Sequence, residues 1–117
     1  TGTKAAAAPA SSPDALARAR ALADAGDLDA ALDAATASIA AAPLDEAPYL
    51  LAALVCEELG RDEQAEALIR RVIYLSPTNA EAQLRLSLIL GRRGESEAAA
   101  RAMAEARRLG IARGATS

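Results

Sequence analysis

Residues 26–31, 60–65 and 94–99 read GDLDAA, GRDEQA and GESEAA. Each stretch begins with a glycine, has an acidic residue fourth and ends with an alanine, and neighbouring stretches are 34 residues apart. The same period relates Leu16 to Leu50 and Leu84, and Pro43 to Pro77. Several columns that share one period predict an array of helical repeat units. Such units stack because a single unit cannot bury its own apolar face.

Each of the three units is predicted to hold two antiparallel helices that meet at its glycine. Ser12 and Pro13 favour a helix start, since serine accepts bonds from unpaired amides and proline fits the first helical position. Pro43 and Pro77 should end the second helices of the first two units. The expected helices cover residues 13–25, 27–41, 46–59 and 62–75, a fifth that follows a capping box of Thr78 and Glu81, and 96–109.

One stretch conflicts locally with this all-α prediction. Residues 83–90, QLRLSLIL, alternate polar and apolar side chains in their first half, as an exposed strand would. The columns of this stretch match helices in the other two units. We therefore expect a helix here, with the tertiary context overriding the alternation.

Composition limits the class of protein. The chain is 52% hydrophobic but only 2% aromatic, so alanine and leucine must build its core. A net charge of −3 argues against a nucleic-acid partner, because phosphate binding needs clustered cations. Residues 1–60 carry three basic and nine acidic side chains, and residues 61–117 carry ten and seven. This asymmetry is either a solvated outer face or a means of steering a partner or a second copy.

The location and the domain limits follow from other features. Cys56 is the single cysteine, which excludes an internal disulfide and indicates a reducing compartment. No apolar run reaches the roughly 18 residues that span a bilayer, so we expect no membrane insertion and a cytoplasmic location. The expected organisation is an Ala/Pro linker over residues 1–11, a repeat domain over 12–110 and a frayed tail over 111–117.

The second unit resembles the tetratricopeptide repeat, a 34-residue helix pair with small and aromatic residues at fixed positions. The positions that carry the resemblance are Tyr49, Ala52, Ala53, Cys56, Ala65, Ile69 and Pro77. The outer units match less well, with Arg18, Gln83 and Ile111 departing most from the pattern. The resemblance covers residues 12–110 and implies three antiparallel helix pairs stacked as a right-handed superhelix. Such domains bind proteins or peptides and are not enzymes.

A narrower resemblance lies in residues 70–90, RRVIYLSPTNAEAQLRLSLIL. This run is similar to the repeat segment that follows some bacterial chemoreceptor methyltransferases. It would imply a regulatory, non-catalytic module attached to an S-adenosylmethionine-dependent enzyme of chemotaxis. A third alternative is an element for oligomerisation or for a secretion or pilus-assembly chaperone.

The first helix of each pair lines the concave side in tetratricopeptide arrays. The residues expected to form a partner-binding groove there are Leu16, Arg20, Leu50, Leu54, Glu57, Glu58, Leu84, Arg85, Leu88 and Arg92. The leucines would hold an apolar or helical segment of a partner, and the charged residues would form a rim. Leucines stand where related domains that grip a terminal carboxylate place Asn and Lys, so no such clamp is expected. The competing interpretation is that these leucines only pack between helices.

Two further expectations concern association and chemistry. Ala99, Met103 and Ala106 would lack the cover of a following repeat, which predicts weak, salt-sensitive self-association at that end. The chain has no histidine, and the neighbouring Glu57 and Glu58 would point about 100° apart on a helix. We therefore expect no catalytic residue, no metal site and no cofactor. Cys56, Tyr49 and Tyr74 are expected to be packing residues.

Overall fold

The computed structural model describes residues 13–110. The predicted linker 1–11 and tail 111–117 lie outside the described residues, so these domain limits stay predictions. Six helices follow one another, with no strand between residues 13 and 110. They are α2 (Pro13–Asp24), α3 (Leu28–Ala41), α4 (Glu46–Glu58), α5 (Asp62–Leu75), α6 (Ala80–Arg92) and α7 (Ser96–Arg108).

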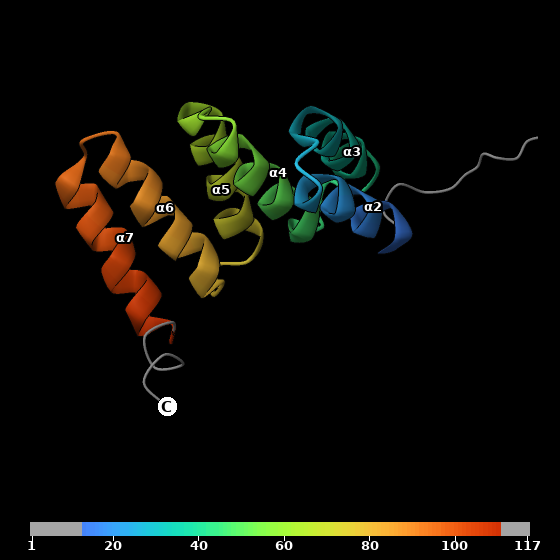
Figure 1. Ribbon diagram of the computed structural model, residues 1–117. Coiled ribbons are helices and arrows are strands. Elements are labelled where there is room, and N and C mark those ends of the chain that lie inside the picture. The colour runs from blue at the N-terminus through green and yellow to red at the C-terminus, as the bar shows by residue number, and fades with distance from the viewer. Residues whose placement is uncertain (1–12, 111–117) are drawn as a thin grey trace, which may run out of the picture.

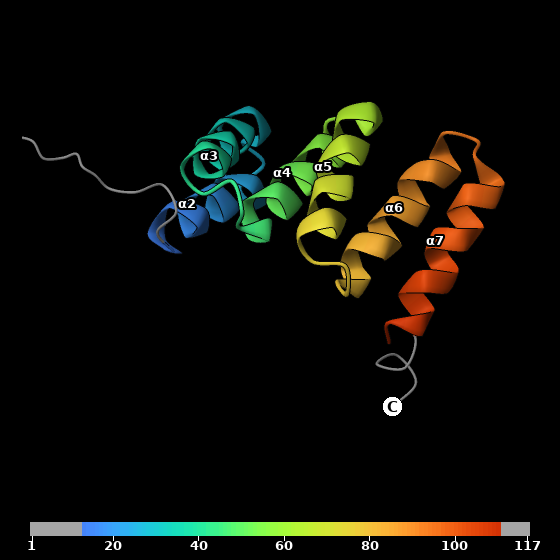
Figure 2. The ribbon, with the colours of Figure 1, turned by 180° about the vertical axis from the view of Figure 1, so that it is seen from behind.

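The helices pair in sequence and the pairs stack side by side. Unit 1 is α2 with α3, unit 2 is α4 with α5 and unit 3 is α6 with α7, and α2 and α7 lie at opposite ends of the row (Figure 1). The view from behind shows the same order (Figure 2). Helices α3 and α5 each pack against the first helix of the next unit. The predicted all-α solenoid of three helix pairs is confirmed.

The turn inside each unit depends on its glycine. Gly60 has a φ of +77°, a left-handed conformation that residues with a Cβ adopt only with strain, and Gly26 and Gly94 are similar at +84° and +81°. Around Gly60, Arg61 N donates to Cys56 O at 2.8 Å and Gly60 N donates to Glu57 O at 3.0 Å. This pair of bonds is a Schellman motif, which satisfies the last carbonyls of α4 and reverses the chain.

The core consists of two clusters, and α4 contributes to both. One cluster lies between units 1 and 2 and the other between units 2 and 3. Leu51, Ala52 and Val55 face the first cluster, whereas Tyr49, Ala53 and Cys56 face the second. Because α4 is covered on both sides, its sequence is apolar almost throughout. The packing roles predicted for Tyr49 and Cys56 are confirmed.

Two local predictions were wrong. Thr78 and Glu81 form no capping box; Asn79 caps α6 instead, and its Oδ1 accepts from Ala82 N at 3.0 Å. Asn79 also donates from Nδ2 to Glu46 Oε1 at 2.9 Å, which ties the start of unit 3 to the start of unit 2. Tyr74 is not a packing residue, because it is 75% exposed.

The open end of the array is only partly as predicted. Ala99 and Met103 are half-buried, whereas Ala65 and Ile69, which occupy the same columns in unit 2, are fully buried. No described helix follows α7, and this accounts for the difference. Ala106 is fully buried, because it faces α6 within its own unit, so it does not lack cover.

Candidate protein-binding groove

The predicted groove residues lie on the first helices of the three units. Leu16 and Arg20 lie on α2, Leu50 and Leu54 on α4, and Leu84 and Leu88 on α6. Since they recur at a period of one unit, they take corresponding places on successive helices. We call the surface formed by these residues with Glu57, Glu58, Arg85 and Arg92 the first-helix groove.

The leucines of this groove divide into two groups by whether they pack against the core clusters. Leu16 and Leu50 pack against the core clusters, as the competing interpretation expects. Leu88 is 41% exposed, and Leu54 and Leu84 are half-buried and pack against neither cluster. The apolar surface left for a partner is therefore concentrated on α4 and α6, at Leu54, Leu84 and Leu88.

A small hollow marks the α4 side of this surface. It has a volume of about 170 Å³ and lies where the end of α2 and the start of α3 meet α4. Leu54 and Glu58 line it together with Ala23, Asp24, Leu28 and Val55. A hollow of this size accommodates one or two side chains, not a whole ligand.

Arg92 and one carboxylate oxygen of Glu57 are occupied by contacts between helices, whereas Glu57 Oε2 is buried without a hydrogen-bond partner. Arg92 Nη2 donates to Glu57 Oε1 at 3.0 Å and to Asp62 Oδ1 at 3.0 Å, and Arg92 Nε donates to Asp62 Oδ2 at 3.0 Å. The Arg92 hydrogen bonds hold the pKa of the Asp62 carboxyl below its usual value. This network joins unit 3 to both helices of unit 2.

Arg85 is the groove cation with a buried hydrogen-bond donor that has no partner among the described residues. Its side chain is half-buried, and its Nε atom is buried without a hydrogen-bond partner. Arg20 and Glu58 are exposed and have no ion-pair partner among residues 13–110. A buried donor without a partner is costly, and a bound carbonyl or carboxylate would satisfy it.

The described residues offer little for catalysis. Burial raises the pKa of the Cys56 thiol, although the charge of Arg61 acts in the opposite direction. A higher thiol pKa leaves less thiolate, and the thiolate is the reactive form. Within residues 13–110, no group of three or more Cys, Asp or Glu residues is arranged to hold a metal ion. None of the helices in that range is long and apolar enough to cross a bilayer.

The comparisons with known proteins agree with this fold. The family model of the tetratricopeptide repeat matches residues 47–79, which form most of unit 2 and the turn that follows it. None of the curated proteins searched matches the sequence. The chain therefore has a tetratricopeptide-type helical array, in which unit 2 carries the recognisable repeat.

Several solved structures have a similar fold at low sequence identity. The second tetratricopeptide domain of Spaghetti (RPAP3), bound to the HSP90 peptide SRMEEVD, is 19% identical with a TM-score of 0.79, over 82% of this chain and 89% of that one. The TPR2B domain of yeast Sti1, in a pHsp70 complex, is 23% identical with a TM-score of 0.79, over 82% and 77%. MamA from Desulfovibrio magneticus RS-1 is 21% identical with a TM-score of 0.78, over 81% and 54%, so this chain spans about half of that protein.

Proposed function

We propose that this chain is a protein-interaction domain that holds an apolar or helical segment of a partner in the first-helix groove. The observation that carries the proposal is the exposure of Leu88 beside half-buried Leu54 and Leu84, outside both core clusters. Exposed leucines at helical spacing are the surface that an amphipathic helix covers. The HSP90 peptide bound to the Spaghetti domain and the pHsp70 complex of the Sti1 domain support the same class of function.

Within this groove, Arg85 would fix the direction of the bound segment. Its unpartnered Nε needs an oxygen acceptor, which a backbone carbonyl or a side-chain carboxylate of the partner supplies. We do not extend the proposal to a clamp for a terminal carboxylate. Leucines occupy the positions where such a clamp would need Asn and Lys.

The test uses selected peptides as the probe. A phage-displayed library of random 16-residue peptides is panned on the domain, and the selected peptides are synthesised with a fluorescein label. Leu54→Asp with Leu88→Asp should raise the Kd of groove-binding peptides by at least about 30-fold, because a desolvated apolar anchor is typically worth about 2 kcal/mol. Leu44→Asp is the matched control, since Leu44 is 81% exposed in the turn between α3 and α4.

The circular dichroism spectrum must show equal helicity in all variants. Leu50 is left unchanged because it packs against the core, and an aspartate there would test folding instead of binding. The groove assignment fails if every selected peptide binds the double variant as tightly as it binds the Leu44→Asp control.

We further propose a weak self-association through α7 and a cytoplasmic location. The partial exposure of Ala99 and Met103 supports the first, and the lone, buried Cys56 supports the second. Sedimentation velocity at 50 and 500 mM NaCl tests the association, and a monomer at every concentration would exclude it.

The comparisons do not support the narrower resemblance to chemoreceptor methyltransferases, and no observation favours a chaperone element.

A further inference from the structure

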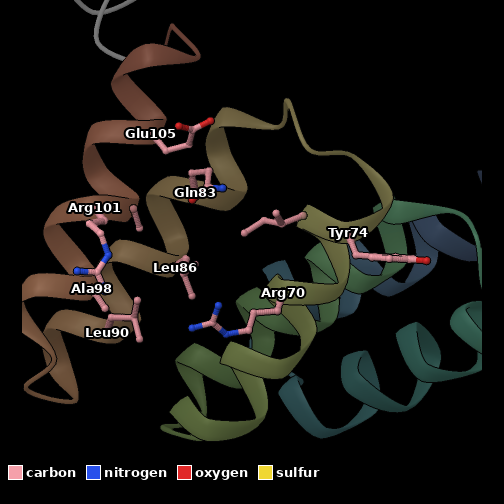
Figure 3. Close-up of a pocket in the computed structure, with 10 residues that line it drawn as sticks. Arg70, Tyr74, Gln83, Leu86, Leu90, Ala98, Arg101 and Glu105 are labelled. Carbon is pink, nitrogen blue, oxygen red and sulfur yellow. The ribbon is translucent and has the colours of Figure 1, made fainter.

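A second hollow lies on the other side of α6 from the first-helix groove. It has a volume of about 500 Å³ and runs between α5 and α7, with α6 as its floor (Figure 3). Leu86 and Leu90 of this floor lie about 160° around the helix from Leu84 and Leu88. We call this hollow the α5–α7 groove. None of its residues belongs to the predicted site.

The floor of the α5–α7 groove is apolar and its walls are basic. Leu86 and Leu90 form the floor, and apolar side chains at Ile73, Ala98 and Ala102 extend it up both walls. Arg70 of α5 and Arg101 of α7 project from opposite walls on either side of the leucines (Figure 3). This combination suits a ligand with an apolar face and negative charges at its edges.

Both arginines have unused hydrogen-bond donors. Arg101 has no described partner, and Arg70 uses only Nε, which donates to Glu66 Oε2 at 2.9 Å. The one carboxylate on the wall, Glu105, accepts hydrogen bonds from Arg108, including one of 3.0 Å from Nε. Glu66 therefore offsets the charge of Arg70, and Arg108 offsets that of Glu105, so among residues 13–110 Arg101 is the groove arginine left without a described carboxylate partner.

Tyr74 lies at one edge of the groove, and its ring points away from Leu86 and Leu90 (Figure 3). Its ring is 75% exposed, and the guanidinium of Arg71 lies 5.7 Å from the ring centroid. The same guanidinium lies 5.9 Å from the ring of Tyr49, so Arg71 links the exposed ring to a buried one. Tyrosine and arginine are the residues most often found at energetic centres of protein interfaces.

We infer that the α5–α7 groove is a second protein-binding surface, which takes a peptide segment that combines leucine-like side chains with at least two carboxylates. The apolar side chains contact half-buried Ile73 and Ala98 above the buried floor of Leu86 and Leu90. The carboxylates pair with Arg101 and with the Nη atoms of Arg70. The occupant is a peptide and not a nucleic acid, because two arginines on a chain of net charge −3 offer too few cations for a phosphate backbone. The two grooves would let one domain hold two partners.

The experiment uses the same library of random 16-residue phage-displayed peptides, panned on the whole chain with the first-helix groove disabled by Leu54→Asp and Leu88→Asp. Selected peptides should be rich in Asp or Glu together with Leu, Ile or Phe. In this background, Arg101→Glu should raise their Kd at least about tenfold, by fluorescence anisotropy at 100 mM NaCl. Arg107→Glu is the matched control, because Arg107 lies exposed on α7, has no described partner and does not line the groove.

Three outcomes overturn the inference. Selection of no peptide, or equal weakening by Arg101→Glu and Arg107→Glu, would show that the groove has no specific ligand of this kind. Self-association of the wild-type chain that Arg101→Glu abolishes in sedimentation velocity would identify a second copy as the occupant. The proposed function fails if peptides selected on the wild-type chain bind the Leu54→Asp, Leu88→Asp variant unchanged. That result leaves this inference intact, so the two failures are distinguishable.

Discussion

Arg92 Nη2 lies 3.0 Å from Glu57 Oε1, across 35 positions of sequence. The same nitrogen also reaches Asp62, so one guanidinium joins the end of α6 to the end of α4 and the start of α5. The column of Arg92 holds Asp24 in unit 1 and Glu58 in unit 2. The joint between units 1 and 2 therefore lacks this arginine, and Leu59 packs there against the apolar cluster instead.

Arg92→Met should destabilise the domain by about 1 kcal/mol. The Glu57 side chain is only 10% exposed, and a nearly buried carboxylate that loses its donor carries a desolvation cost. Arg92 itself is 44% exposed, so screening by solvent keeps the effect at the low end of the range for charged hydrogen bonds. The measurement is urea unfolding followed by circular dichroism. Arg107→Met is the control, and equal losses in both variants would contradict the structural role of Arg92.

Asp62→Asn should destabilise the domain at neutral pH and have a smaller effect in acid. Arg92 holds the pKa of Asp62 below its value in the unfolded chain. A depressed pKa stabilises the folded state above the unfolded pKa of about 3.9, and this contribution is lost as pH falls through the folded pKa. The difference in Tm between wild type and Asp62→Asn should therefore narrow below about pH 4. In an Arg92→Gln background the difference should be small at every pH, and a gap that persists there would point to another cause.

The columns of the sequence predicted the fold because each has a direct structural cause. The glycine column supplies the left-handed turns, and the alanine column lets two helices approach closely. The acidic column pairs with the next unit, since Arg61 lies 4.0 Å from Asp29 and Arg93 lies 4.0 Å from Glu63. These pairs are long and exposed, so they add little to the stability of the stack.

The strand-like alternation in residues 83–90 also has a cause. Leu86 and Leu90 face the core, whereas Leu84 and Leu88 face the first-helix groove. A step of two residues turns a helix by about 200°, so a helix with apolar residues on two opposite faces shows the period of a strand. The local pattern was ambiguous, and only the comparison with the other units favoured the helix.

The α5–α7 groove could not be predicted from these columns. Arg70 occupies the column of Thr36 and Ala104, and Arg101 that of Asp33 and Ala67, so neither residue recurs. The groove also requires the relative placement of three helices, which depends on side-chain packing and not on periodicity. The usable signal was the departure of individual arginines and of Tyr74 from the residue types of their columns.

Tyr49→Phe should cost about 1 kcal/mol of stability, whereas Tyr74→Phe should change it by less than about 0.5 kcal/mol. Tyr49 is 6% exposed, and its hydroxyl donates to Pro43 O at 2.8 Å, which fixes the turn between units 1 and 2. Tyr74 is the matched control because its hydroxyl has no described partner and its ring is exposed. Both variants keep the ring face, so the contact with Arg71 is retained. Equal stability of the two variants would show that the Tyr49 hydrogen bond contributes nothing.

Gly91→Ala should stabilise the domain by about 0.5 kcal/mol, and Gly60→Ala should destabilise it by about 1–2 kcal/mol. A Cβ atom at either position would meet no atom within 4 Å, so neither change creates a clash. Gly91 lies in the helical conformation of α6, where alanine loses less conformational entropy on folding than glycine does. Gly60 has a φ of +77°, where an L-residue is strained whatever space surrounds it. Thermal and urea unfolding of the two variants should therefore move in opposite directions, and a stabilised Gly60→Ala variant would mean that the left-handed turn does not hold unit 2 together.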